Sequence, residues 1–138
     1  MGGLSQGSFS LTSEGHGLFQ GSVSLENNGG FTSVRHRFSA LEVNSASKIK
    51  IRLKGDGRAY QFRIKDASRQ YYSYITTFST NGEWQDIEIP LGEMEPYFRG
   101  RKLNLTNFSE NQIEEIVFLI ANKKEEQFEL LIDSVVLE

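Results

Sequence analysis

The chain has 138 residues, 38% of them hydrophobic, and a net charge of −3, which fits one folded domain over residues 1–138. This charge gives no reason to expect a nucleic-acid partner, because such proteins are usually strongly basic. The absence of cysteine excludes disulfides and thiolate metal sites, and fits a cytoplasmic or other reducing compartment. No apolar run approaches the roughly 20 residues that span a bilayer, so we expect a soluble protein without a membrane span.

Strand patterns recur along the whole chain, either as alternating apolar and polar residues or as β-branched and aromatic runs. The predicted strands are Gly17–Leu25, Phe31–Phe38, Lys48–Lys54, Ala59–Lys65, Tyr71–Phe78, Trp84–Ile89, Ile116–Ala121 and Phe128–Leu137. Ile116–Ala121 is apolar at every position, which predicts a strand buried on both faces. Only Ser109–Gln112 looks like a helix start, and Glu93–Lys102 is expected to be a long ordered loop. The pattern predicts an all-β antiparallel sandwich with at most one short helix.

Two glycine-rich turns, Asn27-Asn28-Gly29-Gly30 and Gly55-Asp56-Gly57-Arg58, join neighbouring predicted strands and are typical of β-hairpins. A two-residue turn at Asp56-Gly57 would pair Lys48–Lys54 with Ala59–Lys65. This register keeps all apolar side chains on one face, whereas a slip of one residue would mix the faces.

The same register sets like charges opposite one another, Lys50 against Arg63 and Lys48 against Lys65, which is unfavourable. An anionic group should therefore lie nearby. Asp86 and Glu88 of another strand could supply it, and we favour this interpretation because charged faces are usually just solvated. The alternative is an acidic or polyhydroxyl ligand held by Lys50, Arg52, Gln61 and Arg63.

Several motifs occur in an order that resembles the complex I intermediate-associated protein 30 family. They are Met1-Gly2-Gly3, the run from Phe19 through Asn27-Asn28-Gly29-Gly30-Phe31, Lys54-Gly55-Asp56-Gly57-Arg58-Ala59-Tyr60, Trp84 before Ile89-Pro90, and Phe98-Arg99-Gly100-Arg101. The resemblance implies a jelly-roll sandwich similar to galactose-binding and carbohydrate-binding modules, and an assembly-factor (chaperone) role for respiratory complex I. Family members usually carry a segment ahead of Met-Gly-Gly, so we expect this domain to lack it or to have a shortened edge strand.

Catalytic and metal-binding patterns are missing from the sequence. No Ser/His/Asp order or nucleophile elbow occurs, and the two histidines, His16 and His36, have no cysteine or ordered carboxylate motif beside them. Asp86 and Glu88 are neighbours on one predicted strand, unlike the paired carboxylates that flank a glycosidase cleft. We therefore expect a protein that is not an enzyme and that uses no cofactor or metal.

The aromatic residues between positions 71 and 78 occupy both faces of their predicted strand, so some should be exposed. Exposed tyrosines could stack on sugar rings or lie in a protein interface. We expect Tyr60 and Phe78 to belong to the core and Trp84 to anchor it.

Two functions follow from these observations. The first is a non-catalytic binding module that engages a protein partner, as the family resemblance implies. The second is a carbohydrate-binding module that uses the polar face of one sheet. The candidate ligand-binding residues are Arg35, Arg37, Lys50, Arg52, Gln61, Arg63, Tyr72 and Tyr74.

Overall fold

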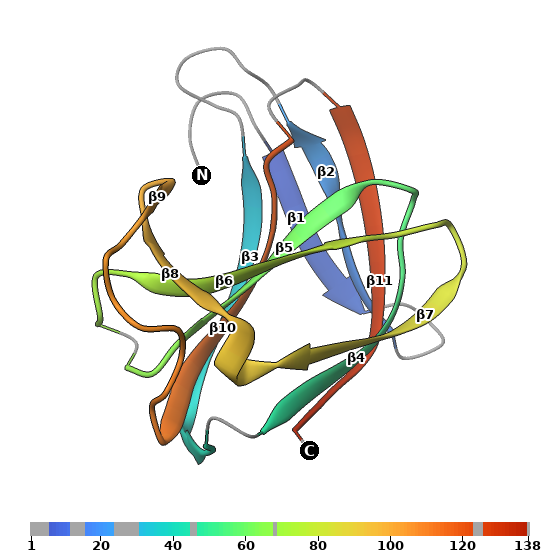
Figure 1. Ribbon diagram of the computed structural model, residues 1–138. Coiled ribbons are helices and arrows are strands. Elements are labelled where there is room, and N and C mark those ends of the chain that lie inside the picture. Colours follow the sequence, from blue (N-terminus) through green and yellow to red (C-terminus); the bar gives the residue numbers. More distant parts are fainter. Residues whose placement is uncertain are drawn as a thin grey trace.

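The computed structural model describes residues 6–11, 16–23, 31–44, 47–67, 69–122 and 126–137, the first of these ranges by its backbone alone. Within these ranges two antiparallel sheets lie against one another, with their apolar faces turned inward (Figure 1). The predicted all-β sandwich is confirmed.

The first sheet has five strands in the order β1-β2-β11-β4-β7. The strands are β1 (Gln6–Leu11), β2 (Gly17–Val23), β11 (Glu126–Leu137), β4 (Lys48–Lys54) and β7 (Trp84–Pro90). The chain's last described strand thus lies in the middle of this sheet, where β2 pairs with one side of it and β4 with the other.

The second sheet has six strands in the order β3-β10-β5-β6-β8-β9. The strands are β3 (Thr32–Glu42), β10 (Gln112–Ile120), β5 (Ala59–Lys65), β6 (Ser73–Ser79), β8 (Glu95–Phe98) and β9 (Arg101–Lys102). β3 is an edge strand, because its only partner in the described part of the chain is β10.

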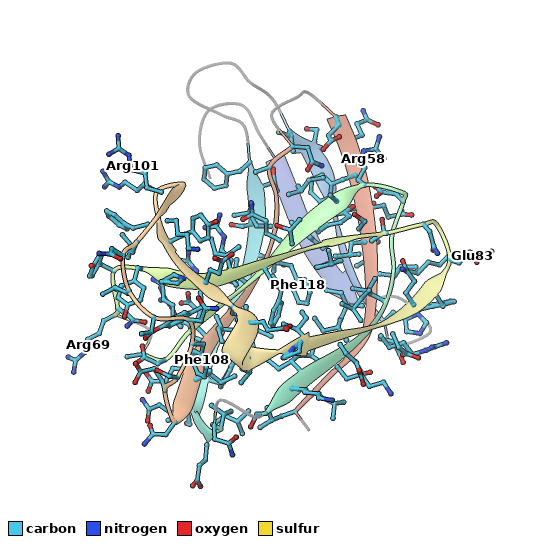
Figure 2. The ribbon with its side chains drawn as sticks, viewed as in Figure 1. Arg58, Arg69, Glu83, Arg101, Phe108 and Phe118 are labelled. Atoms are coloured by element: carbon cyan, nitrogen blue, oxygen red, sulfur yellow. The ribbon has the colours of Figure 1, made fainter. Side chains whose placement is uncertain are left out.

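The core is formed by alternate residues of the two sheets. Ile51 and Leu53 of β4 face Tyr60 and Phe62 of β5 across it, and all four side chains are almost completely buried. Charged residues such as Arg58, Arg69 and Glu83 lie at the periphery, as Figure 2 shows. The predicted core positions of Tyr60 and Phe78 are confirmed. Val117–Ile120 are also all buried, as predicted for a strand covered on both faces.

The two predicted hairpins are wrong. β4 and β5 belong to different sheets, so Gly55-Asp56-Gly57-Arg58 is a crossover and Lys50 does not pair with Arg63. β2 and β3 are likewise in different sheets, and their connecting glycine-rich turn lies outside the described residues. The alternation of apolar and polar residues is the same for a hairpin and for two strands in facing sheets. In a hairpin the apolar side chains of both strands lie on one face of a sheet, and in facing sheets they point toward each other across the core.

Two smaller expectations are also wrong. The predicted helix start at Ser109–Gln112 leads straight into β10, where β-branched and aromatic residues favour a strand. The predicted loop at Glu93–Lys102 contains the β8–β9 hairpin, whose turn residues Arg99 and Gly100 both have positive φ, at 50° and 80°. The structure has a short 3₁₀ turn at Leu91–Glu93, and in the described residues no helix is long and apolar enough to cross a membrane.

Candidate functional site

The crossover from β4 to β5 approaches the end of β6 closely. A Cβ at Gly55 would overlap the side chain of Thr80, and Gly57 has a φ of +88°. The Thr80 hydroxyl accepts a hydrogen bond from the Gly57 N–H at 3.0 Å and donates one to the Arg58 carbonyl at 2.7 Å. Gly55 is therefore required by its close contact with Thr80, and Gly57 by its backbone conformation.

The side chains of this crossover form a network that we call the corner network, made of Asp56, Arg58, Tyr60 and Glu126. Asp56 Oδ1 accepts hydrogen bonds from the Tyr60 hydroxyl at 2.9 Å and the Arg58 N–H at 3.2 Å. Asp56 Oδ2 accepts from the Glu129 N–H at 2.8 Å and from Arg58 Nη1 at 3.1 Å. Arg58 Nε donates to Glu126 Oε2 at 3.2 Å.

The corner network ties the two sheets together, since Asp56 connects the crossover to the backbone of β11. Burial raises the pKa of the Tyr60 hydroxyl well above its usual value, and the carboxylate of Asp56 raises it further. The polar groups of the Gly-Asp-Gly-Arg motif are thus engaged within the fold. The motif therefore has a structural role.

The expected single basic face is wrong, because its residues lie on two sheets. Lys50 and Arg52 belong to β4 of the five-stranded sheet, where Lys50 is opposite Glu88 and Arg52 is opposite Asp86 of β7. Arg52 Nη1 lies 3.5 Å from Asp86 Oδ1. Asp86 thus offsets the charge of Arg52, and Glu88 lies across the ladder from Lys50, but the like-charged pair of Lys50 and Arg63 that motivated this expectation does not occur.

Trp84 is not in the core, contrary to the prediction. It lies on the outer face of the five-stranded sheet, with the Arg52 guanidinium 5.4 Å from its ring centroid and the His16 ring 4.8 Å away. His16 Nε2 and Arg52 Nε both approach Asp133, at 3.3 Å and 3.8 Å. These charges are of both signs, so they largely balance on this face.

The other four predicted polar residues come together on the outer face of the six-stranded sheet. Arg35 of β3 and Arg63 of β5 are both opposite Val117 of β10, while Gln61 is opposite Leu119. Two residues farther along the same two strands, Arg37 of β3 is opposite Glu115 of β10. We call this set, comprising Arg35, Arg37, Gln61, Arg63 and Glu115, the arginine face.

The arginine face has one buried carboxylate and three guanidinium groups. The Glu115 side chain is fully buried, with Oε1 at 2.9 Å from Arg37 Nε and Oε2 at 3.5 Å from Arg35 Nε. Arg63 donates to Gln61 Oε1 from Nε at 3.0 Å and from Nη2 at 2.6 Å. Burial lowers the pKa of Arg63, and the charge of Arg35 lowers it further. With three guanidinium groups and one carboxylate, the arginine face has a local excess of positive charge.

Tyr72 and Tyr74 lie away from the arginine face. Tyr74 is buried in the core, Tyr72 packs against the core, and their hydroxyl oxygens are 3.4 Å apart. Burial raises the pKa of the Tyr74 hydroxyl, and the hydrogen bond with Tyr72 adds to this effect. The exposed tyrosine of this group is Tyr71, which is 63% exposed and contacts the ring of Phe98.

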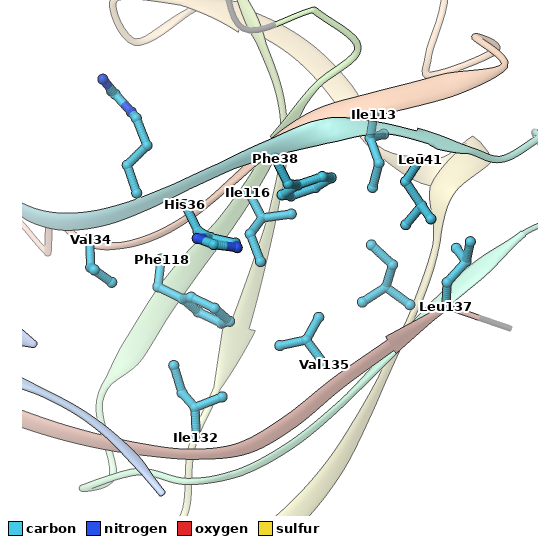
Figure 3. Close-up of a pocket in the computed structure, with 12 residues that line it drawn as sticks. Val34, His36, Phe38, Leu41, Ile113, Ile116, Phe118, Ile132, Val135 and Leu137 are labelled. Carbon is cyan, nitrogen blue, oxygen red and sulfur yellow. The ribbon is translucent and has the colours of Figure 1, made fainter. Parts of the chain in front are cut away.

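A pocket of about 550 Å³ opens between the sheets, where β3 faces the C-terminal part of β11. We call it the edge pocket. Figure 3 shows side chains of β3 and β10 projecting toward those of β11 across the opening. Most of its lining is apolar; the residues are Val34, Arg35, His36, Phe38, Leu41, Ile49, Ile113, Ile116, Phe118, Ile132, Val135 and Leu137.

Sequence reasoning missed both Glu115 and the edge pocket. Glu114 and Glu115 directly precede the apolar run Ile116–Ile120, and this acidic pair was the available signal, although it does not show which of the two is buried. The pocket depends on which strands end early, and alternation does not reveal that. In the described ranges, no group of three or more His, Asp and Glu residues could hold a metal ion.

Solved structures with this architecture include carbohydrate-binding modules. A family 11 module from Clostridium thermocellum, in complex with a β-1,3-1,4-mixed-linked tetrasaccharide, has a TM-score of 0.75 at 16% identity, covering 97% of this chain and 83% of that chain. The family 11 module of the C. thermocellum cellulase Lic26A-Cel5E has a TM-score of 0.77 at 15% identity, covering 97% and 82%. At such identities the likeness defines the fold class, a jelly-roll β-sandwich.

The family is defined by the sequence. The model of the family described as Complex I intermediate-associated protein 30 matches residues 1–132, nearly the whole chain. The chain therefore belongs to this family, as its motifs suggested. No curated protein matches the sequence.

Proposed function

We propose that this protein is a non-catalytic binding module that engages a protein partner through its arginine face. Membership of the complex I intermediate-associated protein 30 family supports a role related to the assembly of respiratory complex I. The family does not say which surface is used, so that part of the proposal rests on the chemistry of the two sheets.

The observation that carries the proposal is the charge balance of the arginine face. Arg35, Arg37 and Arg63 share this face with one carboxylate, Glu115, which lies within ion-pair distance of Arg35 and Arg37 only. On β4, by contrast, Lys50 and Arg52 each lie opposite a carboxylate of β7. Arginine is enriched in protein interfaces and at their energetic centres, because its planar guanidinium binds carboxylates with two hydrogen bonds. An acidic region of a partner protein fits this face.

Co-purification tests this proposal. The tagged chain is expressed in respiring cells of its source, and complex I subunits bound to it are identified and quantified by mass spectrometry. We expect Arg63→Gln to reduce their recovery at least fivefold, while Lys48→Gln, which removes the same charge from the other sheet, leaves it unchanged. Equal recovery with both variants, or the absence of complex I subunits from the wild-type sample, would contradict the proposal.

A carbohydrate ligand is the second candidate function. It is supported by the fold shared with carbohydrate-binding modules and by polar groups such as Gln61 and Thr77, which are opposite one another on adjacent strands. The exposed ring of Tyr71, the kind of group on which a sugar could stack, lies apart from them. Affinity electrophoresis in gels containing mixed-linkage β-glucan separates the two functions: retardation lost in an Arg35→Ala/Arg63→Ala variant supports carbohydrate binding, and unretarded migration excludes this glucan.

A further inference from the structure

The edge pocket lies beside a length of β11 that is paired on one side only. Pairing between β11 and β2 ends where Ile132 meets Gly17, but pairing with β4 continues to Leu137 opposite Ile49. A register shift between Ile132 and Ser134 marks this point. Within the described ranges, the backbone of β11 beyond Ile132 therefore has an open side next to the pocket.

The opposite lip of the pocket is also a strand edge. β3 pairs with β10 alone in the described part of the chain, and its residues Val34, His36, Phe38 and Leu41 line the pocket. Exposed strand edges tend to pair with further strands, and proteins usually block them with lysine, proline or a covering segment. Neither β3 nor the last residues of β11 contain lysine or proline.

The lips expose apolar side chains that water solvates poorly. Leu41 is 42% exposed on β3, and Val135 is 37% exposed on β11. The volume of about 550 Å³ lies within the range of ligand pockets in proteins. An occupant should therefore present several apolar side chains to the space between the sheets.

The charges of β3 indicate what the other side of the occupant carries. Arg35, at the rim of the pocket, and Arg37 alternate along β3 with the apolar lining residues, and both approach Glu115 on the arginine face, where their side chains are 50% and 61% exposed. A strand added beside β3 would alternate in the same way. Its inward residues would enter the pocket, and its outward residues would lie next to these two arginines, where acidic side chains are favoured.

We propose that an extended segment of a partner protein, with alternating apolar and acidic residues, adds to the unpaired edge of β3 where it borders the edge pocket, and fills this pocket. Main-chain hydrogen bonds to β3 would supply affinity, and the pocket and the arginines would supply specificity. This inference rests on the proposed function, because it names the kind of segment that the protein partner contributes.

Binding of synthetic peptides tests the inference. The probe is a fluorescein-labelled ten-residue peptide of alternating Val and Glu, measured by fluorescence anisotropy against the full chain. We expect saturable binding of this Val/Glu peptide. Two control peptides should bind at least tenfold more weakly: one of alternating Val and Lys, and one with its five Val and five Glu in separate blocks.

Variants of the two lips locate the binding site. Val135→Asp and Leu41→Asp should each weaken binding of the Val/Glu peptide at least tenfold, and the use of opposite lips guards against one variant failing to fold. The matched control is Val136→Asp: Val136 is the next residue, is 48% exposed, and is absent from the pocket lining, so its change should leave affinity within twofold. Circular dichroism confirms that each variant is folded.

Three results would overturn the inference. The Val/Glu peptide does not bind; or it binds equally well to both folded lip variants; or the pocket is occupied by a second copy of the chain, seen as a dimer in light scattering that Val135→Asp abolishes. Complex I subunits that still co-purify with Val135→Asp, but are lost with Arg63→Gln, would leave the proposed function intact while removing this inference.

Discussion

The corner network and the arginine face are both built from arginines and carboxylates, but in opposite proportions. At the corner, one guanidinium, that of Arg58, lies between the carboxylates of Asp56 and Glu126. On the arginine face there are three guanidinium groups and one carboxylate, that of Glu115, which pairs with two of them. The first arrangement uses its hydrogen-bonding groups within the fold, and the second keeps exposed cations next to a buried anion.

The partners of a charge, more than the charge itself, therefore separate a structural role from a binding role. Asp56 contacts the crossover and β11, so its removal should disturb both sheets. Arg35 and Arg37 are at least half exposed, so their change should cost little stability and act mainly on binding. Stability measurements on variants of the two regions test this distinction.

Loss of Asp56 should have the largest effect. Asp56→Ala leaves the Glu129 N–H without its acceptor and removes the shorter hydrogen bond of the Tyr60 hydroxyl, which keeps only the Glu129 carbonyl at 3.3 Å. We expect this variant to lower the free energy of unfolding by about 3 kcal/mol. Urea denaturation measures this change. Asp86→Ala, at an exposed carboxylate on the other side of β4, is the control and should cost less than about 1 kcal/mol. Equal losses of stability for Asp56→Ala and Asp86→Ala would contradict the structural role of the corner network.

Glu115 should have an intermediate effect on stability. Glu115→Gln removes the anion shared by Arg35 and Arg37, and we expect a loss of about 1–2 kcal/mol, because both partners are exposed enough for water to replace it in part. Glu88→Gln changes the net charge equally on the other sheet and should cost less. A loss as large as that of Asp56→Ala would show that the arginine face is also a structural network.

Alkaline pH should weaken the corner network through Tyr60. Its pKa is raised in the folded state, so its contribution is complete below about pH 10, the usual tyrosine value, and is lost as the pH rises above it. We expect stability to fall by up to about 1.4 kcal/mol per pH unit for this residue. Denaturation at pH 9, 10 and 11 should give a shallower decline for Tyr60→Phe, with the remaining decline due to Tyr74. Parallel curves would contradict this explanation.

The smallest effect is expected at Arg52. Its contacts with Asp86 and Asp133, at 3.5 and 3.8 Å, are long and exposed, so Arg52→Gln should change stability by less than about 0.5 kcal/mol. Arg58→Gln is the matched comparison and should cost about 1–3 kcal/mol, because the Glu126 partner is nearly buried. Thermal unfolding of the two variants under identical conditions checks the order.

The sequence predicted where the strands are, but not how they pair. Lys48–Lys54 and Ala59–Lys65 were predicted with their observed bounds, because their alternation is regular. Their assignment to one hairpin was wrong, since alternation records which face is buried and not which strand lies alongside. The Asp56-Gly57 pair is typical of a hairpin turn, yet here Asp56 accepts hydrogen bonds across a crossover.

The candidate site was predicted only in part, because alternation shows the face on which a side chain lies but not the strand next to it. Arg35, Arg37, Gln61 and Arg63 do share a face, because β10 lies between their two strands. Lys50 and Arg52 were added to that face by the hairpin register, so they were misplaced with it. Glu115 could not be assigned from the sequence, because both of its arginine partners come from β3, which lies far from β10 in the chain.

The central position of β11 has a consequence for how the protein folds during synthesis. Val23 of β2 pairs with Glu126, about a hundred positions later in the chain, and β4 also depends on β11 for one of its two neighbours. While the chain is still on the ribosome, β2 and β4 therefore have exposed edges and no strand to join them. The five-stranded sheet can close only after nearly the whole chain has emerged, so products that stop before Glu126 should aggregate rather than form a smaller version of the fold.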